Sequence, residues 1–218
     1  MTQIIDFYFD VGSPASYLAW TQLPALAQRA NSDIRWKPML LGGVFKATGN
    51  NSPAEVPAKS RYNRLDMSRA ATGYSVPLNF NPYFPVNTLQ VMRGAVAYLS
   101  TLQFDDYLQA VFEAMWVNGK NLADSAVLAE VLAGAGFDPG EVFALCKGSS
   151  AKENLQLITA EAVERGVFGA PTFFVGNEMF FGQDRMNQLE ECLRTENRQP
   201  ATLAFDYVDE ELVWTPIN

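Results

Sequence analysis

The sequence contains no histidine, so it lacks the commonest general base in enzymes. This absence excludes Ser-His-Asp and Cys-His nucleophile systems and every zinc site that depends on histidine. Cysteine is also scarce, because the only two, Cys146 and Cys192, lie 192 − 146 = 46 positions apart and form no CxxC motif. The sequence therefore predicts neither a thiol redox pair nor a metal site. Such low cysteine usage is typical of a reducing compartment.

Positive charge and long apolar runs are lacking as well. The 218 residues carry 16 Lys and Arg against 24 Asp and Glu, a formal net charge of 16 − 24 = −8. This balance argues against nucleic-acid binding, which normally depends on a basic patch. No apolar run approaches the ~20 residues of a membrane span, and the first residues contain no basic segment typical of a signal peptide. We expect a cytoplasmic protein without membrane or nucleic-acid partners.

The composition is that of a folded globular chain. Hydrophobic residues make up 48% and charged residues 18%, which suffices for a packed core. The length predicts one large domain, or one domain that carries an insertion.

The first elements alternate between strand and helix. Ile4–Asp10 is short and almost continuously apolar, as in a strand that is buried on both faces. Ser13 and Pro14 then suit the cap and the first position of a helix, which Pro24 should bend. Ile34–Met39 is predicted as a second strand.

The middle of the chain is predicted to be helical. Residues 41–87 are rich in Gly, Pro and Asn, with one polar helical stretch near residues 57–72. Residues 104–116 follow the i, i+3, i+4, i+7 apolar pattern of an amphipathic helix. Asp138 predicts another helix start, with a stop at Gly148. Ser150 and Glu153 are interpreted as a capping box for a helix that ends at Gly166.

The last part changes period. Residues 171–175 and 179–181 are short apolar runs around a Gly-Asn-Glu turn, which predicts a hairpin, and a helix follows at about residues 185–193. The order β-α-β, helices, then α-β-β-α predicts an α/β fold with a thioredoxin-like sheet interrupted by an all-helical insertion. We assign residues 1–42 and 151–218 to the thioredoxin-like domain and 43–150 to the insertion. The tail at 195–218 receives no role.

Ser13-Pro14-Ala15-Ser16 lies where a thioredoxin-like redox enzyme has its CxxC. Hydroxyls replace both thiols, so this segment cannot exchange disulfides. A helix N-terminus stabilises an anion, and the Ser13 hydroxyl can donate a hydrogen bond to a thiolate placed there. The alternative is that Ser13 is only a helix cap.

Two further segments have a structural and a functional interpretation. Pro171 follows a helix stop and precedes a strand, so it can form a cis-proline turn that exposes the Ala170 backbone to a bound peptide, or it can be an ordinary trans proline. Gln183 and Asp184 lie at a helix start, where they can contact the polar end of a ligand. Asp184 can equally serve as a cap alone.

Together these segments carry a resemblance. Phe9-Asp-Val-Gly-Ser-Pro-Ala-Ser-Tyr17, Gly49-Asn50, Val167-Phe-Gly-Ala-Pro-Thr172 and Phe181-Gly-Gln-Asp-Arg185 occur in order and at suitable spacing. Over about residues 3–194 the chain resembles the 2-hydroxychromene-2-carboxylate isomerase family, relatives of the kappa-class glutathione transferases. The family fold is a thioredoxin-like domain with a helical insertion.

The resemblance implies a cofactor, glutathione, and a small aromatic acid substrate. Ser13 would hold the glutathione sulfur, and the thiolate would add transiently to the substrate during isomerisation. The residues implied to bind glutathione are Ser13, Asn50, Ala170, Phe181, Gly182, Gln183 and Asp184. Lys46 and Phe84 are weaker candidates for the substrate, because they can equally be solvated surface and packing. A homodimer is expected, since family members commonly form one.

Two other functions stay open. A kappa-like transferase would act on electrophiles, and the residues from Gly49 to Pro53 resemble that class at least as closely. A non-catalytic thioredoxin-fold module would bind peptides without turnover.

Overall fold

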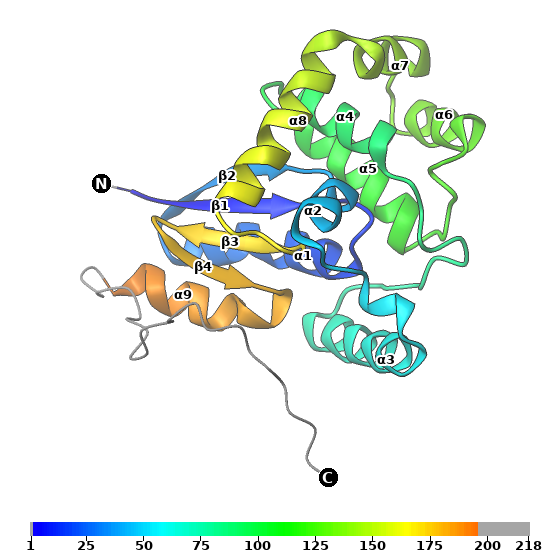
Figure 1. Ribbon diagram of the computed structural model, residues 1–218. Helices are drawn as coiled ribbons and strands as arrows, with labels where there is room; N and C mark the ends of the chain where they lie inside the picture. Colours follow the sequence, from blue (N-terminus) through cyan, green and yellow to red (C-terminus); the bar gives the residue numbers. More distant parts are fainter. Residues whose placement is uncertain (1, 196–218) are drawn as a thin grey trace.

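The computed structural model describes residues 2–195 of the chain. Its centre is a four-stranded mixed sheet in the order β2-β1-β3-β4 (Figure 1). The strands are β1 (Gln3–Phe9), β2 (Ser32–Pro38), β3 (Thr172–Val175) and β4 (Glu178–Phe181). β1 is parallel to β2 and antiparallel to β3, and β3 is antiparallel to β4. The predicted thioredoxin-like α/β fold is confirmed.

Helices cover both faces of this sheet (Figure 1). They are α1 (Pro14–Arg29) and α9 (Met186–Arg194) on one face, and α8 (Ser149–Glu164) on the other. Side chains alternate along β1, so Ile5, Phe7 and Phe9 join the core beneath α1, whereas Tyr8 joins a second cluster that includes Ala162 of α8. The strand is buried on both faces, which explains its nearly continuous apolar sequence.

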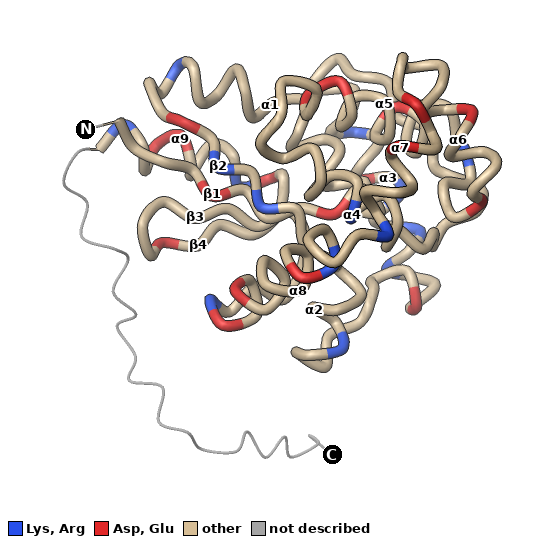
Figure 2. The backbone as a smooth tube through the Cα atoms, turned by 90° about the horizontal axis from the view of Figure 1, so that it is seen from above, with Lys and Arg blue, Asp and Glu red and all other residues tan. Residues whose placement is uncertain are grey.

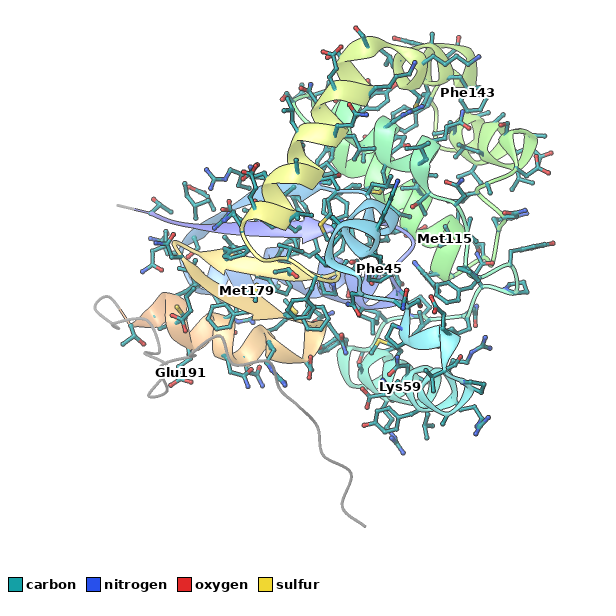
Figure 3. The ribbon with its side chains drawn as sticks, viewed as in Figure 1. Phe45, Lys59, Met115, Phe143, Met179 and Glu191 are labelled. Carbon is teal, nitrogen blue, oxygen red and sulfur yellow. The ribbon has the colours of Figure 1, made fainter. Side chains whose placement is uncertain are left out.

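The remaining helices lie beyond one end of the sheet (Figure 1). They are α2 (Leu41–Thr48), the 3₁₀ turn η1 (Pro53–Glu55), α3 (Pro57–Tyr74), α4 (Leu89–Tyr98), α5 (Phe104–Trp116), α6 (Ser125–Gly134) and α7 (Pro139–Lys147). The amphipathic pattern predicted α5 with the same bounds. Trp116 is fully buried, and its indole N–H donates to Val11 O at 2.7 Å, so the helices share one core with the sheet. Met115, which precedes it on α5 (Figure 3), is also buried in this core. The division of the chain at residues 42 and 151 stays a prediction.

Two local predictions are wrong. The Gly-rich stretch after β2 was not expected to form a helix, yet it forms α2, which ends at Gly49 in a left-handed conformation (φ 71°). The proposed capping box at Ser150 is absent, because α8 already begins at Ser149 and the backbone of Gly148 forms its cap. The Ser150 hydroxyl instead accepts a hydrogen bond from the Asn154 amide at 3.4 Å.

Of the tail at 195–218, residues 196–218 lie outside the described part of the chain. Within residues 2–195, no helix has both the length and the hydropathy that a membrane crossing requires.

Candidate active site

Ser13 lies where β1 passes into α1, and it caps this helix. Its Oγ accepts the Ser16 N–H at 3.1 Å, and its carbonyl accepts the Tyr17 N–H at 3.1 Å. Pro14 has no N–H to satisfy, so the Ala15 N–H is the first-turn donor without a hydrogen bond among the described residues. The first turn also contains no acidic side chain. This helix end therefore favours an anion.

The Ser13 hydroxyl also links α1 to the loop before β3. It donates to Ala170 O at 2.9 Å, across 157 positions of sequence. The Ala170–Pro171 peptide bond is cis, so of the two predictions for this segment the cis-proline turn is correct and the trans proline is wrong. Ala170 lies two residues before Thr172, where the pairing of β3 with its neighbours begins, and its N–H makes no hydrogen bond within residues 2–195. A backbone donor without a partner thus lies beside the Ser13 hydroxyl.

Asp10 stabilises this junction, although no pattern in the sequence predicted a role for it. Its side chain is buried and accepts the N–H groups of Gly12 and Leu41, each at 2.8 Å. Burial raises the pKa of Asp10, while these two hydrogen bonds and one from the Thr88 hydroxyl lower it by less. The carboxylate ties the loop before Ser13 to the start of α2. A lone acidic residue at the end of an apolar strand was the signal available in the sequence.

Asn50 and the aromatic rings form the next part of the site. The Asn50 side-chain amide donates to Phe168 O at 2.8 Å, two residues before Ala170. The Phe168 and Phe181 rings lie 4.5 Å apart, and both are partly exposed. A side chain on Gly169 would lie 2.6 Å from a Phe181 ring carbon, so any other residue there would require this ring to shift.

The segment after β4 completes the arrangement. The Gly182 N–H donates to Pro171 O at 2.9 Å, and Gly182 itself has a φ of 97°. Gln183 is buried, and its carbonyl accepts the Tyr74 hydroxyl at 3.1 Å. Asp184 is exposed and pairs with Arg185 at 2.7 Å. Its predicted role as a helix cap is wrong, because it lies inside the 3₁₀ turn η2 (Gln183–Arg185) and α9 begins at Met186 without a side-chain cap.

The structure thus brings most of the predicted site residues to one end of the sheet. Direct contacts connect Ser13 with Ala170, and Asn50 with the loop that leads to it. The two substrate candidates lie apart from these contacts. Lys46 is exposed in the last turn of α2, and the half-buried Phe84 packs 5.9 Å from the Trp116 ring.

This geometry defines a class of protein: a thioredoxin-fold protein with a serine at the helix N-terminus where redox members carry a reactive cysteine. The family model of the DsbA-like thioredoxin domain matches residues 4–194. The chain belongs to the 2-hydroxychromene-2-carboxylate isomerase family of DsbA-like thioredoxin-fold proteins, which is related to the kappa-class glutathione transferases.

Three relatives illustrate this placement. A 2-hydroxychromene-2-carboxylate isomerase of Pseudomonas putida is 34% identical over 203 residues, covering 92% of this chain and 99% of the relative. Glutathione S-transferase kappa 1 of Caenorhabditis elegans is 32% identical over 214 residues, covering 91% and 94%. A solved structure of a 2-hydroxychromene-2-carboxylate isomerase superposes with a TM-score of 0.78 at 34% identity, covering 87% of this chain and 94% of the other.

Proposed function

We propose that this protein is a glutathione-dependent isomerase that interconverts 2-hydroxychromene-2-carboxylate and trans-o-hydroxybenzylidenepyruvate in the breakdown of aromatic compounds. The observation that carries the proposal is the Ser13 hydroxyl at the α1 N-terminus, 2.9 Å from Ala170 O beside a cis proline. Three relatives with the name of this isomerase are 32–35% identical to the chain.

The residues around Ser13 fit glutathione. A thiolate needs hydrogen-bond donors and positive potential, which the Ser13 O–H, the Ala15 N–H and the end of α1 offer. The peptide part of the cofactor needs backbone partners, and the Ala170 N–H has no other bond in residues 2–195. We assign Asn50, Phe181, Gly182, Gln183 and Asp184 to the same cofactor.

Bound glutathione would supply the nucleophilic sulfur for reversible addition to the aromatic acid. The chain itself keeps that sulfur ionised. Because the Ser13 hydroxyl has a single proton, it cannot donate to a thiolate and to Ala170 O at once. It must leave Ala170 O, whose carbonyl then requires another donor, and a ligand amide N–H meets that need. In this way, peptide binding at Ala170 would release the hydroxyl that stabilises the sulfur.

Lys46 and Phe84 are our candidates for binding the substrate. We assign Lys46 to the carboxylate of the aromatic acid and Phe84 to its ring. Within the described chain, the Lys46 ammonium makes no ion pair that would compete for it. We also propose a homodimer in the cytoplasm, where glutathione is kept as the thiol.

Thermal unfolding with and without glutathione tests cofactor binding. A ligand that binds only the native state at 100 times its Kd adds about 2.7 kcal/mol to the free energy of unfolding. We expect a clear rise in Tm with glutathione, and glutathione-dependent loss of the chromene absorbance during turnover. An unchanged Tm at millimolar glutathione would remove the basis of the proposal.

A kappa-like transferase is the second candidate, favoured by the 32% identity to a kappa-class enzyme. Assays with the chromene acid and with a chlorinated aromatic electrophile separate the two functions. The isomerase proposal predicts turnover of the first substrate without consumption of glutathione. Conjugation of the second, with no isomerisation, would favour the transferase.

A further inference from the structure

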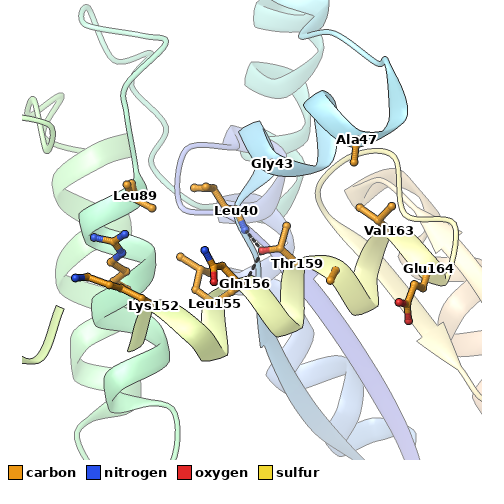
Figure 4. A pocket seen from close by; sticks show the side chains of 12 residues that line it. Leu40, Gly43, Ala47, Leu89, Lys152, Leu155, Gln156, Thr159, Val163 and Glu164 are labelled. Carbon is orange, nitrogen blue, oxygen red and sulfur yellow. Dashed lines mark hydrogen bonds between the residues drawn. The ribbon is translucent and has the colours of Figure 1, made fainter. Parts of the chain in front are cut away.

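A cavity lies between α2, α4 and α8 (Figure 4). Its volume is about 630 Å³, within the range of small-molecule sites. None of the residues assigned to glutathione or to the aromatic acid lines it. We call it the α8 groove.

One face of α8 forms the floor of the α8 groove. Lys152, Leu155, Thr159 and Val163 follow one another at helical spacing and all line it. Lys152 and Val163 are 11 residues apart, so the floor is about 16 Å long at 1.5 Å per residue. Figure 4 shows Lys152 at one end of this row and Glu164 at the other.

The walls of the α8 groove are mostly apolar, and some of their side chains are small. Leu40, Gly43 and Ala47 line it from α2 and its start, and Leu89 lines it from α4. The polar atoms of Thr159 are already used, because its hydroxyl accepts the Leu40 N–H at 3.0 Å and donates to Leu155 O at 2.6 Å. Apart from the exposed amide of Gln156, the middle of the groove therefore presents apolar surface and suits an apolar body.

Positive charge is concentrated at one end. Arg93 of α4, four residues after Leu89, lines the α8 groove together with Lys152. Within residues 2–195 neither cation forms an ion pair, and the Arg93 Nε is buried without a hydrogen-bond partner. The Cys146 thiol, which Arg93 influences, does not neutralise it, because burial raises the pKa of Cys146 to about 11. A guanidinium without an acceptor or an ion pair is costly to bury, and an anion that binds its terminal nitrogens would offset that cost.

Other charges do not supply that anion. Figure 2 shows basic and acidic positions interspersed over the elements, and the chain as a whole is acidic. The carboxylate among the groove residues, Glu164, lies three helical turns from Lys152, at the opposite end. The charge is thus polarised along the α8 groove, with an apolar stretch between the two ends.

We propose that the α8 groove binds a small amphipathic monocarboxylate, with its carboxylate between Arg93 and Lys152 and its apolar body along α8. A guanidinium and a carboxylate make charge-assisted hydrogen bonds. Because the cations lie at one end of the groove only, the groove favours a ligand with one carboxylate. A second carboxylate at the far end would meet Glu164. The proposal does not depend on glutathione or on Ser13.

Two probes represent the aromatic and the aliphatic sources of such an acid: naphthalene-2-carboxylate and decanoate. Titration calorimetry of the full chain should show one saturable site for at least one of them. The matching alcohols, 2-naphthalenemethanol and decanol, should bind about tenfold more weakly or worse, because they lack the charge. Equal binding of acid and alcohol would refute the role of the cations, and no saturable binding of either acid would refute the site.

Three variants locate the site. The double variant Arg93→Gln, Lys152→Gln should weaken acid binding about tenfold or more, whereas Lys59→Gln, an exposed lysine on α3 (Figure 3), should not change it. Ala160→Phe, which fills the exposed middle of the α8 groove without a change in charge, should weaken it too. Ser13→Ala should leave it unchanged.

Circular dichroism and Tm confirm that each variant is folded. Should the double variant be unfolded, Arg93→Lys and Ala160→Phe keep the test intact, since the first retains the charge but loses the planar donor pair. Acid affinity that is the same in wild type, in the charge variants and in Ala160→Phe would place the ligand elsewhere. Loss of acid binding in Ser13→Ala would place it in the glutathione site and also overturn the inference.

Discussion

Replacement of Ser13 by alanine removes the hydroxyl that we assign to the glutathione sulfur. A hydrogen bond to a charged acceptor contributes about 1.5–3 kcal/mol, and about 1.4 kcal/mol equals one pKa unit. We therefore expect the pKa of the bound thiol to be about 1–2 units higher in Ser13→Ala than in the wild type. The positive end of α1 remains in the variant, so the pKa should stay below that of free glutathione. Isomerase turnover near neutral pH should fall about ten- to hundredfold.

The same substitution also affects the fold, and the two effects must be separated. Ser13 Oγ caps α1 through the Ser16 N–H at 3.1 Å, and the loss of such a cap costs about 0.5–2 kcal/mol. Ser16→Ala is the matched control. Its hydroxyl lies one turn further along the same helix, is buried and has no hydrogen-bond partner in the described part of the chain. Removal of that hydroxyl should leave both the thiol pKa and the turnover unchanged.

The assay is a pH titration of the thiolate absorbance in the protein–glutathione complex, with S-methylglutathione as the blank. Far-ultraviolet circular dichroism establishes that the variant is folded at each pH. If folded Ser13→Ala binds glutathione with the wild-type thiol pKa and wild-type turnover, Ser13 is a helix cap only. If Ser16→Ala shifts the pKa as much as Ser13→Ala does, the hydroxyl has been assigned to the wrong residue.

Asp184→Ala should weaken glutathione binding by about tenfold, as expected for a lost charged contact, and an unaltered Kd by calorimetry would leave Asp184 without a role in binding. Gly169→Ala places a carbon 2.6 Å from a neighbouring aromatic ring and should lower the free energy of unfolding by about 1–3 kcal/mol. Gly42→Ala is the control, because, apart from its chain neighbours and the backbone of its own helix, no atom of residues 2–195 lies within 4 Å of the added carbon, and it should not destabilise the protein. Equal effects of the two substitutions in urea unfolding would contradict the packing argument. Burial and the hydrogen bond to Glu161 raise the pKa of Tyr8 from 10.0 to about 12, so its neutral form stabilises the folded state below pH 10, and this contribution is lost as the pH rises towards 12. Tyr8→Phe should remove that part of the alkaline loss, and identical alkaline unfolding curves would disprove it.

Elements with a strong local pattern were predictable. The heptad-like spacing of residues 104–116 predicted α5 because a regular apolar stripe has one stable solution, a helix against a core. Asp138 was predicted as a cap, and its carboxylate does accept the N–H groups of Gly140 and Glu141. In both segments, the decisive interactions lie within four residues of one another.

Elements that depend on tertiary contacts were not predictable. Gly42 and Gly43 lower intrinsic helix propensity, so the sequence of α2 suggested a loop. The helix forms because its surroundings hold it: the Leu41 N–H bonds to Asp10, and Gly43 packs against Thr159 of α8. Asp184 failed as a predicted cap for a local reason: its carboxylate pairs with the adjacent Arg185, and a 3₁₀ turn precedes α9.

In the candidate site, too, the type of a residue could be recognised from the sequence, whereas its hydrogen-bond partner could not. Ser13 was recognisable because a hydroxyl stands where a redox enzyme needs a thiol, but its partner Ala170 is 157 positions away. Asn50 bonds to Phe168 O across 118 positions, and no local pattern contains that pairing. The role of Asp10 was not predicted, because Asp10 joins two loops that come together only in the folded sheet. The chemistry of this site depends on single residue types that the sequence shows. Its geometry depends on three long-range hydrogen bonds, made by Ser13, Asp10 and Asn50. A substitution at Asp10 or Asn50 should therefore displace Ser13 and Ala170, although neither of these two residues is changed.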